Sequence, residues 1–134
     1  MRVAKTVRRF QKSDELVRFI VGPVGSGKSS ACILEIPWRA QRQAPGPDGV
    51  RRTRFAIIRN TYSQLRDTTR KTFEQWIPPG LGVWHEQSFT WSGRWFLDQA
   101  RTDPVECEVL FRALDRPEDV KKLLSLELTG AYIN

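Results

Sequence analysis

The chain has 134 residues, of which 40% are hydrophobic and 28% charged, and it carries a formal net charge of +7. This length suits one globular core and is short for two, so we expect a single domain. No apolar run approaches the ~20 residues that span a bilayer, and no apolar segment follows the basic N-terminus, so neither a membrane nor secretion is indicated. The two cysteines, Cys32 and Cys107, have no second Cys or His at metal-ligand spacing, which argues against a zinc site or a disulfide framework.

Most of the excess positive charge lies in one tract. Nine of the 22 Lys and Arg residues fall between Arg39 and Lys71, together with only two acids. Such a tract can bind a polyanion through phosphate contacts that are largely independent of sequence and sensitive to salt. Within it, we expect Arg51, Arg52 and Arg54 to bind the phosphates of DNA from a loop rich in Pro and Gly. The alternative is a solvated loop and helix face.

Two strands and two helices are predicted in the first half of the chain. The apolar run LVRFIV, at Leu16 to Val21, predicts a buried strand, and RFAIIRN, at Arg54 to Asn60, predicts a second one. Between them a helix is expected to begin near Lys28, and Pro37 should bend or end it. A second helix is predicted over residues 63–77, before the PPG stretch that stops it. One face of this helix is formed by Leu65, Thr69, Phe73 and Trp76.

The second half of the chain has a different pattern. SFTWSGRWFL predicts an antiparallel hairpin with a turn at Ser92–Gly93, and VECEVLF predicts a strand because its apolar residues alternate. DRPEDVKKLL predicts a helix with Asp115 or Arg116 at its cap and Pro117 in its first turn, and LELTGAYIN predicts a last strand. This order of elements predicts an α/β fold, in which helices flank a parallel core sheet that carries an antiparallel β insertion.

The stretch GPVGSGKS, at residues 22–29, carries the most specific chemical signal. It matches G-x-x-x-x-G-K followed by Ser or Thr, with the apolar strand before it and the helix after it that this motif requires. Its glycines let the backbone curve around an anion, and successive N–H groups can then point at phosphate oxygens at the positive end of the helix. Lys28 supplies a charge for the β- and γ-phosphates, and the Ser29 hydroxyl is placed to coordinate Mg²⁺.

This motif therefore predicts that ATP binds together with Mg²⁺. The alternative is a Gly-rich turn with a chance lysine. Ser30 offers a second hydroxyl close to Ser29. The predicted nucleotide-binding residues are Gly22, Pro23, Val24, Gly25, Ser26, Gly27, Lys28, Ser29 and Ser30.

Hydrolysis of ATP needs a second set of groups, namely an acid for Mg²⁺ and, in many ATPases, a glutamate that polarises the attacking water. Their predicted place is the tip of the last strand, where Asn134 takes the metal-proximal position. An asparagine can hold Mg²⁺ indirectly, but it has no charge and cannot act as a general base. Glu127 is expected to lie about 20 Å or more from this tip. His85 has no Ser or Cys partner in the pattern, so we do not assign it a catalytic role.

Three stretches carry a resemblance to a known family. FIVGPVGSGKSSACILEI, FAIIRNTYSQLRDTT and LFRALDRPEDVKKLLSLELTGAYIN, in this order and spacing, resemble the N-terminal ATPase domain of the large terminase subunit of tailed phages. The resemblance runs from about Phe19 to Asn134 and is weakest between Trp84 and Thr102. It implies a P-loop NTPase fold and a single ATPase domain over residues 1–134, incomplete at its C-terminus and without the nuclease domain that normally follows.

The resemblance also implies a function. A large terminase subunit is a motor that hydrolyses ATP to drive double-stranded viral DNA into a capsid, as a homo-oligomeric ring with the portal and the small terminase subunit, in the cytoplasm of the bacterial host. Lys28 would be catalytic and Asn134 would fall at the Walker B position, so that turnover should be very slow. The family also uses an arginine against the neighbouring subunit's phosphates, for which the candidates are Arg59, Arg66 and Arg116.

Two other functions remain open on the same motif. One is a P-loop kinase of a small metabolite, which would need a lid with clustered arginines and an acceptor pocket. The other is a prophage remnant that binds ATP or nucleic acid without turnover. Stimulation of ATP turnover by double-stranded DNA, rather than by small hydroxyl acceptors, distinguishes the motor from the kinase.

Overall fold

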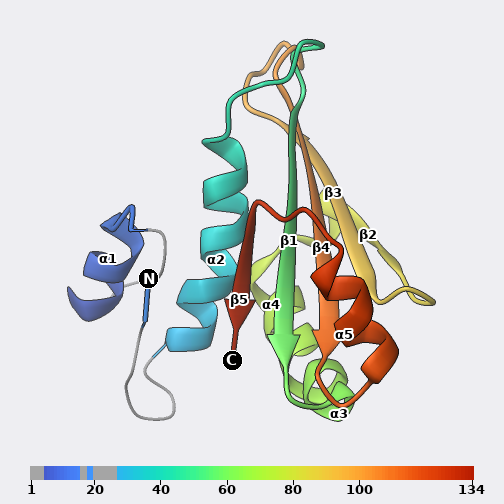
Figure 1. The fold of residues 1–134 in the computed structure, drawn as a ribbon. Coiled ribbons are helices and arrows are strands. Elements are labelled where there is room, and N and C mark those ends of the chain that lie inside the picture. The colour runs from blue at the N-terminus through green and yellow to red at the C-terminus, as the bar shows by residue number, and fades with distance from the viewer. Residues whose placement is uncertain (1–4, 16–17, 20–26) are drawn as a thin grey trace.

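The computed structural model describes residues 5–15, 18–19 and 27–134 as an α/β fold, with a mixed five-stranded sheet flanked by helices (Figure 1). The strand predicted at Leu16 to Val21 lies outside the described residues, except for Arg18 and Phe19, which belong to no strand. Within the described ranges, no helix has both the length and the apolar character that crossing a membrane requires.

The sheet has the strand order β2-β3-β4-β1-β5. β1 runs parallel to both of its neighbours, β4 and β5, whereas β3 is antiparallel to β4 and to β2. The predicted parallel core is therefore confirmed for three strands, and the antiparallel part extends the same sheet at one edge. The strands are β1 (Arg51–Arg59), β2 (Gly82–His85), β3 (Thr90–Phe96), β4 (Pro104–Ala113) and β5 (Gly130–Ile133).

Helices cover both faces of this sheet. Figure 1 shows α5 in front of β1 and β4 and α4 behind them. The main core lies on the face of α2 and α4, where Phe73 and Ile33 pack on alternate residues of β1 and β4. A smaller cluster lies under α5 on the opposite face. The helices are α1 (Lys5–Lys12), α2 (Lys28–Gln41), α3 (Tyr62–Gln64), the π-helical turn η1 (Leu65–Thr69), α4 (Arg70–Trp76), the 3₁₀ turn η2 (Pro79–Leu81) and α5 (Pro117–Leu124).

Several predicted elements are confirmed, with small changes in their bounds. The helix expected near Lys28 begins at that residue, but it continues through Pro37 to Gln41, because Ile33, Ile36 and Ala40 bury its inner face on both sides of the proline. The alternation predicted in β4 is present, with Val105 and every second residue after it up to Phe111 buried. The last strand is shorter than expected and includes only Gly130–Ile133.

The turn predicted at Ser92–Gly93 is wrong. Both residues lie inside β3, where Gly93 pairs with Gly82 of β2, and the connection between these strands falls at residues 86–89. Gly93 is required for packing, because a Cβ there would lie 2.1 Å from Cη2 of the Trp91 indole. A glycine that makes room for an aromatic ring has the same sequence pattern as a glycine in a turn.

Replacing Gly93 by alanine is expected to lower the free energy of unfolding by about 1–3 kcal/mol, because the buried Trp91 ring must move to accommodate the added methyl group. Urea denaturation measures this change. Gly80→Ala is the matched control, since a Cβ at Gly80 meets nothing within 4 Å. Equal stabilities of the two variants would contradict the packing role of Gly93.

Candidate functional site

The start of α2 forms one side of the candidate site. Gly27 has φ 83° and ψ 12°, a left-handed conformation that favours glycine, and its carbonyl accepts a hydrogen bond from the amide of Ala31 at 2.9 Å. No side chain caps the first turn. The first two residues of α2 are Lys28, which is half-buried, and Ser29, which is exposed. The other predicted loop residues, Gly22, Pro23, Val24, Gly25 and Ser26, lie outside the described residues.

Ser29 and Asn134 line the same small pocket, although they are far apart in the sequence. β1 and β5 run parallel and end at the edge of the sheet where α2 begins (Figure 1). Ile57 pairs with Tyr132, and the amide of Asn134 donates to the carbonyl of Ile58 at 3.0 Å. In open α/β sheets, ligands bind outside the carboxyl ends of the strands. The lining residues are Ser29, Ile33, Arg59, Thr68, Thr69, Thr72, Tyr132 and Asn134.

This pocket is small and carries positive charge. Its volume is about 10 Å³, which is room for one group the size of a water molecule. Among the described residues that line it, Arg59 is the only charged one, and the other polar groups are hydroxyls and one amide. The described residues thus surround one end of a ligand rather than a whole nucleotide, and they favour an anionic end.

Arg59 is held in place from the side of the π-helical turn. Its Nη1 donates to Oγ1 of the buried Thr69 at 3.2 Å. Its Nε is buried and has no hydrogen-bond partner among the described residues. A buried N–H without an acceptor is costly, so an acceptor at this position would be bound favourably. Single π-helical turns occur frequently at functional sites, and η1 is the turn that carries Thr68 and Thr69 to the pocket.

Tyr132 brings β5 next to the start of α2. Its side chain and Ser29 line the same small pocket. Burial raises the pKa of Tyr132 above its ordinary value, and the neighbouring Ser29 opposes this shift only in part. The phenol therefore stays protonated at neutral pH and can donate a hydrogen bond to a ligand.

The oxygen ligands of the site suit Mg²⁺ only when water and the phosphates of a substrate supply most of its coordination. Ser29 and Asn134 offer a hydroxyl and an amide oxygen, and the described part of the chain places no carboxylate in the pocket lining. Among the residues that the structure describes, no group of three or more His, Cys, Asp or Glu side chains is placed to hold a metal. Mg²⁺ commonly keeps several waters and takes phosphate oxygens from its substrate. The residues present fit an ion held mainly by phosphate and water, with Ser29 as the protein ligand.

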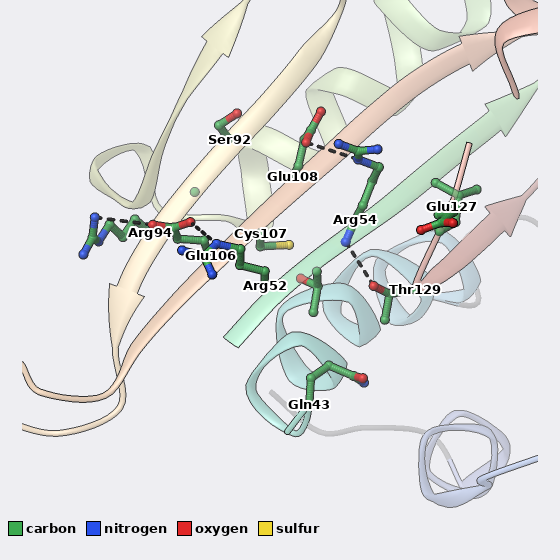
Figure 2. Close-up of a pocket in the computed structure, with 13 residues that line it drawn as sticks. Gln43, Arg52, Arg54, Ser92, Arg94, Glu106, Cys107, Glu108, Glu127 and Thr129 are labelled. Atoms are coloured by element: carbon green, nitrogen blue, oxygen red, sulfur yellow. Dashed lines mark hydrogen bonds and ion pairs between the residues drawn. The ribbon is translucent and has the colours of Figure 1, made fainter. Parts of the chain in front are cut away.

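A larger pocket lies away from this edge, along the N-terminal halves of β1 and β4 (Figure 2). Its volume is about 820 Å³, and its walls carry both charges. Figure 2 shows Glu106 between Arg52 and Arg94, at 3.3 and 3.4 Å, and Arg54 beside Glu108 at 3.3 Å. Its three arginines face three glutamates, so this pocket offers no net charge to a phosphate.

The predicted phosphate-binding cluster of Arg51, Arg52 and Arg54 needs correction. These arginines lie in strand β1 and not in the Pro/Gly loop. Each of them pairs with acids that are distant in the sequence or lie in the preceding turn. The pairs are Arg51–Asp103, Arg52–Asp48, Arg52–Glu106 and Arg54–Glu108. Their charge is largely compensated, which favours the alternative of a solvated face.

The remaining candidates do not approach the site. Glu127 lines the larger pocket and precedes β5, as expected for an exposed strand-entry residue. His85 does have a serine partner, contrary to the sequence interpretation, because its Nε2 lies 3.2 Å from Oγ of Ser92 across the hairpin. Neither residue lines the small pocket beside Ser29. Burial raises the pKa of the Cys32 and Cys107 thiols to about 11, which leaves them protonated and weakly reactive.

Four polar lining residues were missed from the sequence, namely Thr68, Thr69, Thr72 and Tyr132. A signal for two of them was present. Thr69 shares the apolar helix face of Leu65 and Phe73, where a polar residue calls for a hydrogen-bond partner. Tyr132 is two residues before Asn134, so both face the same side of a strand.

Comparison of the chain with protein-family models, with curated proteins and with solved structures finds no match. What the site binds is therefore inferred from its own residues.

Proposed function

We propose that the chain binds the triphosphate of ATP, together with Mg²⁺, at the edge of the sheet where α2 begins and β1 and β5 end. One observation carries this proposal: Ser29 and Asn134, assigned to the phosphate loop and to the metal-proximal strand tip, line one pocket. The lining also contains an arginine and no carboxylate. The Ser29 hydroxyl and the Asn134 amide can bind a metal ion, and Arg59 and the helix N-terminus beside them can bind the phosphate that carries it.

The phosphate loop supplies the rest of the site in this proposal. Its sequence has the spacing of a P-loop, and Gly27 takes the left-handed conformation that ends such a loop at the first residue of a helix. Lys28 then contacts the β- and γ-phosphates, and the Ser29 hydroxyl coordinates the metal. The P-loop NTPase fold is part of the same proposal, supported by the parallel order of β4, β1 and β5.

The biological role that we propose is that of the ATPase part of a phage large terminase subunit. Such a subunit packages double-stranded DNA in the bacterial cytoplasm, as a ring that works with the portal and the small subunit. The sequence stretches quoted above support this role. Because the arginines at the start of β1 are paired with acids, DNA contacts are expected elsewhere on the surface.

A second candidate is an ATP-binding chain without turnover, and one observation favours it. Asn134 has no charge, and none of the described residues that line the pocket is a carboxylate that could activate water. A chain of this second kind binds ATP in the same way as the proposed motor subunit. The two differ only in whether phosphate is released.

Titration of the full chain with Mg·ATP, followed by a phosphate-release assay with and without double-stranded DNA, tests the proposal. We expect saturable binding of one ATP per chain and turnover that is very slow but rises when double-stranded DNA is added. No phosphate release in either condition would support the second candidate. Stimulation by small hydroxyl compounds instead would support the kinase. An absence of ATP binding would refute the proposed function, and brisk turnover would show that another carboxylate activates water.

A further inference from the structure

Arg59 stands out from the other arginines of the basic tract. Eight arginines lie between residues 39 and 71, and all the others form ion pairs with described carboxylates. Arg59 forms none in the part of the chain that the structure describes. A partly buried guanidinium without a carboxylate is unusual, because charges removed from water are normally paired. No described carboxylate neutralises the charge of Arg59, so this arginine can bind an anionic ligand.

The direction of its side chain is set by the strand and by a hydrogen bond. Side chains alternate along β1, and Arg59 follows Ile57 on the face that packs against α2. Thr69 fixes one arm of the guanidinium through Nη1 at 3.2 Å. The Nε atom is buried and has no acceptor among the residues that the structure describes, and Arg59 itself lines the pocket. The guanidinium is thus preorganised beside Ser29 and Asn134, with donors still to be satisfied.

We infer that Arg59 contacts the terminal phosphate of a nucleoside triphosphate bound by the same chain, and so makes the site bind ATP more tightly than ADP. This inference rests on the proposed function. Lys28 and Ser29 belong to the start of α2, whereas Arg59 is the last residue of β1, so Arg59 approaches the site from a different element. The pocket between Ser29, Arg59 and Asn134 admits about one oxygen-sized group, which suits the outermost phosphate oxygens rather than the whole chain.

The position of Arg59 also separates it from the other two arginines considered for contact with a neighbouring subunit. Arg66 and Arg116 lie over the ring of Tyr62, at 5.7 and 3.9 Å from its centroid, and neither lines the pocket. Arg59 belongs to the pocket of its own chain. Its contact is therefore made within one subunit and does not require a ring.

The test compares ATP and ADP affinities, measured by equilibrium titration with Mg²⁺, in the full chain and in Arg59→Met. Methionine keeps most of the apolar stem but removes the charge. We expect the affinity for ATP to fall about 10- to 100-fold and the affinity for ADP to change less than about twofold. Arg42→Met is the matched control, since Arg42 is exposed at the far end of α2 and paired with Asp14 at 3.8 Å, and it should leave both affinities unchanged.

The outcomes separate this inference from the proposed function. If the original chain binds neither nucleotide, the proposed function fails and the inference fails with it. If the chain binds both and Arg59→Met weakens both equally, or neither, then Arg59 does not contact the terminal phosphate, although the nucleotide site stands. Should Arg59→Met not fold, Arg59→Gln takes its place, because its amide can still bind Thr69. The same loss of preference for ATP is expected, and an unchanged preference overturns the inference.

Discussion

Replacing Lys28 by alanine is expected to weaken the binding of Mg·ATP by about 10- to 100-fold. Lys28 is the first residue of α2 and follows the left-handed Gly27, so it belongs to the positive end of the helix, where anions bind favourably. A hydrogen bond that involves a charged group contributes about 1.5–3 kcal/mol, and about 1.4 kcal/mol corresponds to a tenfold change in affinity. Because this lysine serves the β-phosphate as well as the γ-phosphate, ADP binding should also weaken.

Equilibrium titration of both nucleotides against Lys28→Ala measures this effect. Lys71→Ala, which removes an exposed lysine from α4, serves as the control and should bind both as the original chain does. The two nucleotides together separate the role of Lys28 from that of Arg59, for which only ATP binding should change. If Lys28→Ala and the original chain bound ATP with equal affinity, the assignment of the phosphate loop would be refuted.

Replacing Phe73 by alanine is expected to lower the free energy of unfolding by about 3–5 kcal/mol. Phe73 is 1% exposed and packs edge-to-face on three rings that come from three strands. Its centroid lies 5.6 Å from that of Trp84, 5.1 Å from Trp91 and 5.4 Å from Phe111. The truncation leaves a cavity and removes these contacts, each of which contributes about 0.5–1.5 kcal/mol beyond the buried area.

Urea denaturation of Phe73→Ala and of Val83→Ala provides the comparison. Val83 is 60% exposed on the edge strand β2, so its truncation should change stability by no more than about 0.5 kcal/mol. The loss expected for Phe73 is a large part of the about 5–15 kcal/mol that stabilises an ordinary domain. A change below about 1 kcal/mol would show that α4 does not anchor the hairpin and β4 as described.

The parallel core was predictable because its sequence signals are local. β4 alternates apolar and polar residues, β1 has a continuous apolar run at its centre, and a Gly directly before Lys28 determines where α2 begins. The ion pairs formed by the arginines at the start of β1 were less predictable. Arg51 and Arg52 follow a Pro/Gly loop, and nothing local indicates that Asp103 and Glu106 lie beside them, since a parallel partner comes from a distant part of the chain.

Other features depend on packing and cannot be read from a local pattern. Gly93 reads as a turn, but it makes room for the Trp91 ring. The π-helical turn at Leu65–Thr69 keeps the apolar pattern of an ordinary helix, so its extra width has no signature in the sequence. For the candidate site, the motif indicates Ser29, and the strand pattern indicates Asn134. The selection of Arg59 among three arginines required the register of β1 with β5.

A crystal structure of the chain with Mg²⁺ and a non-hydrolysable ATP analogue tests the central claim most directly. The claim is that a triphosphate binds where α2 begins and β1 and β5 end. We expect the γ-phosphate within hydrogen-bond distance of the Arg59 guanidinium, and Mg²⁺ within coordination distance of the Ser29 hydroxyl. A nucleotide seated instead in the larger pocket between Arg52, Arg54 and Glu127 would contradict the claim.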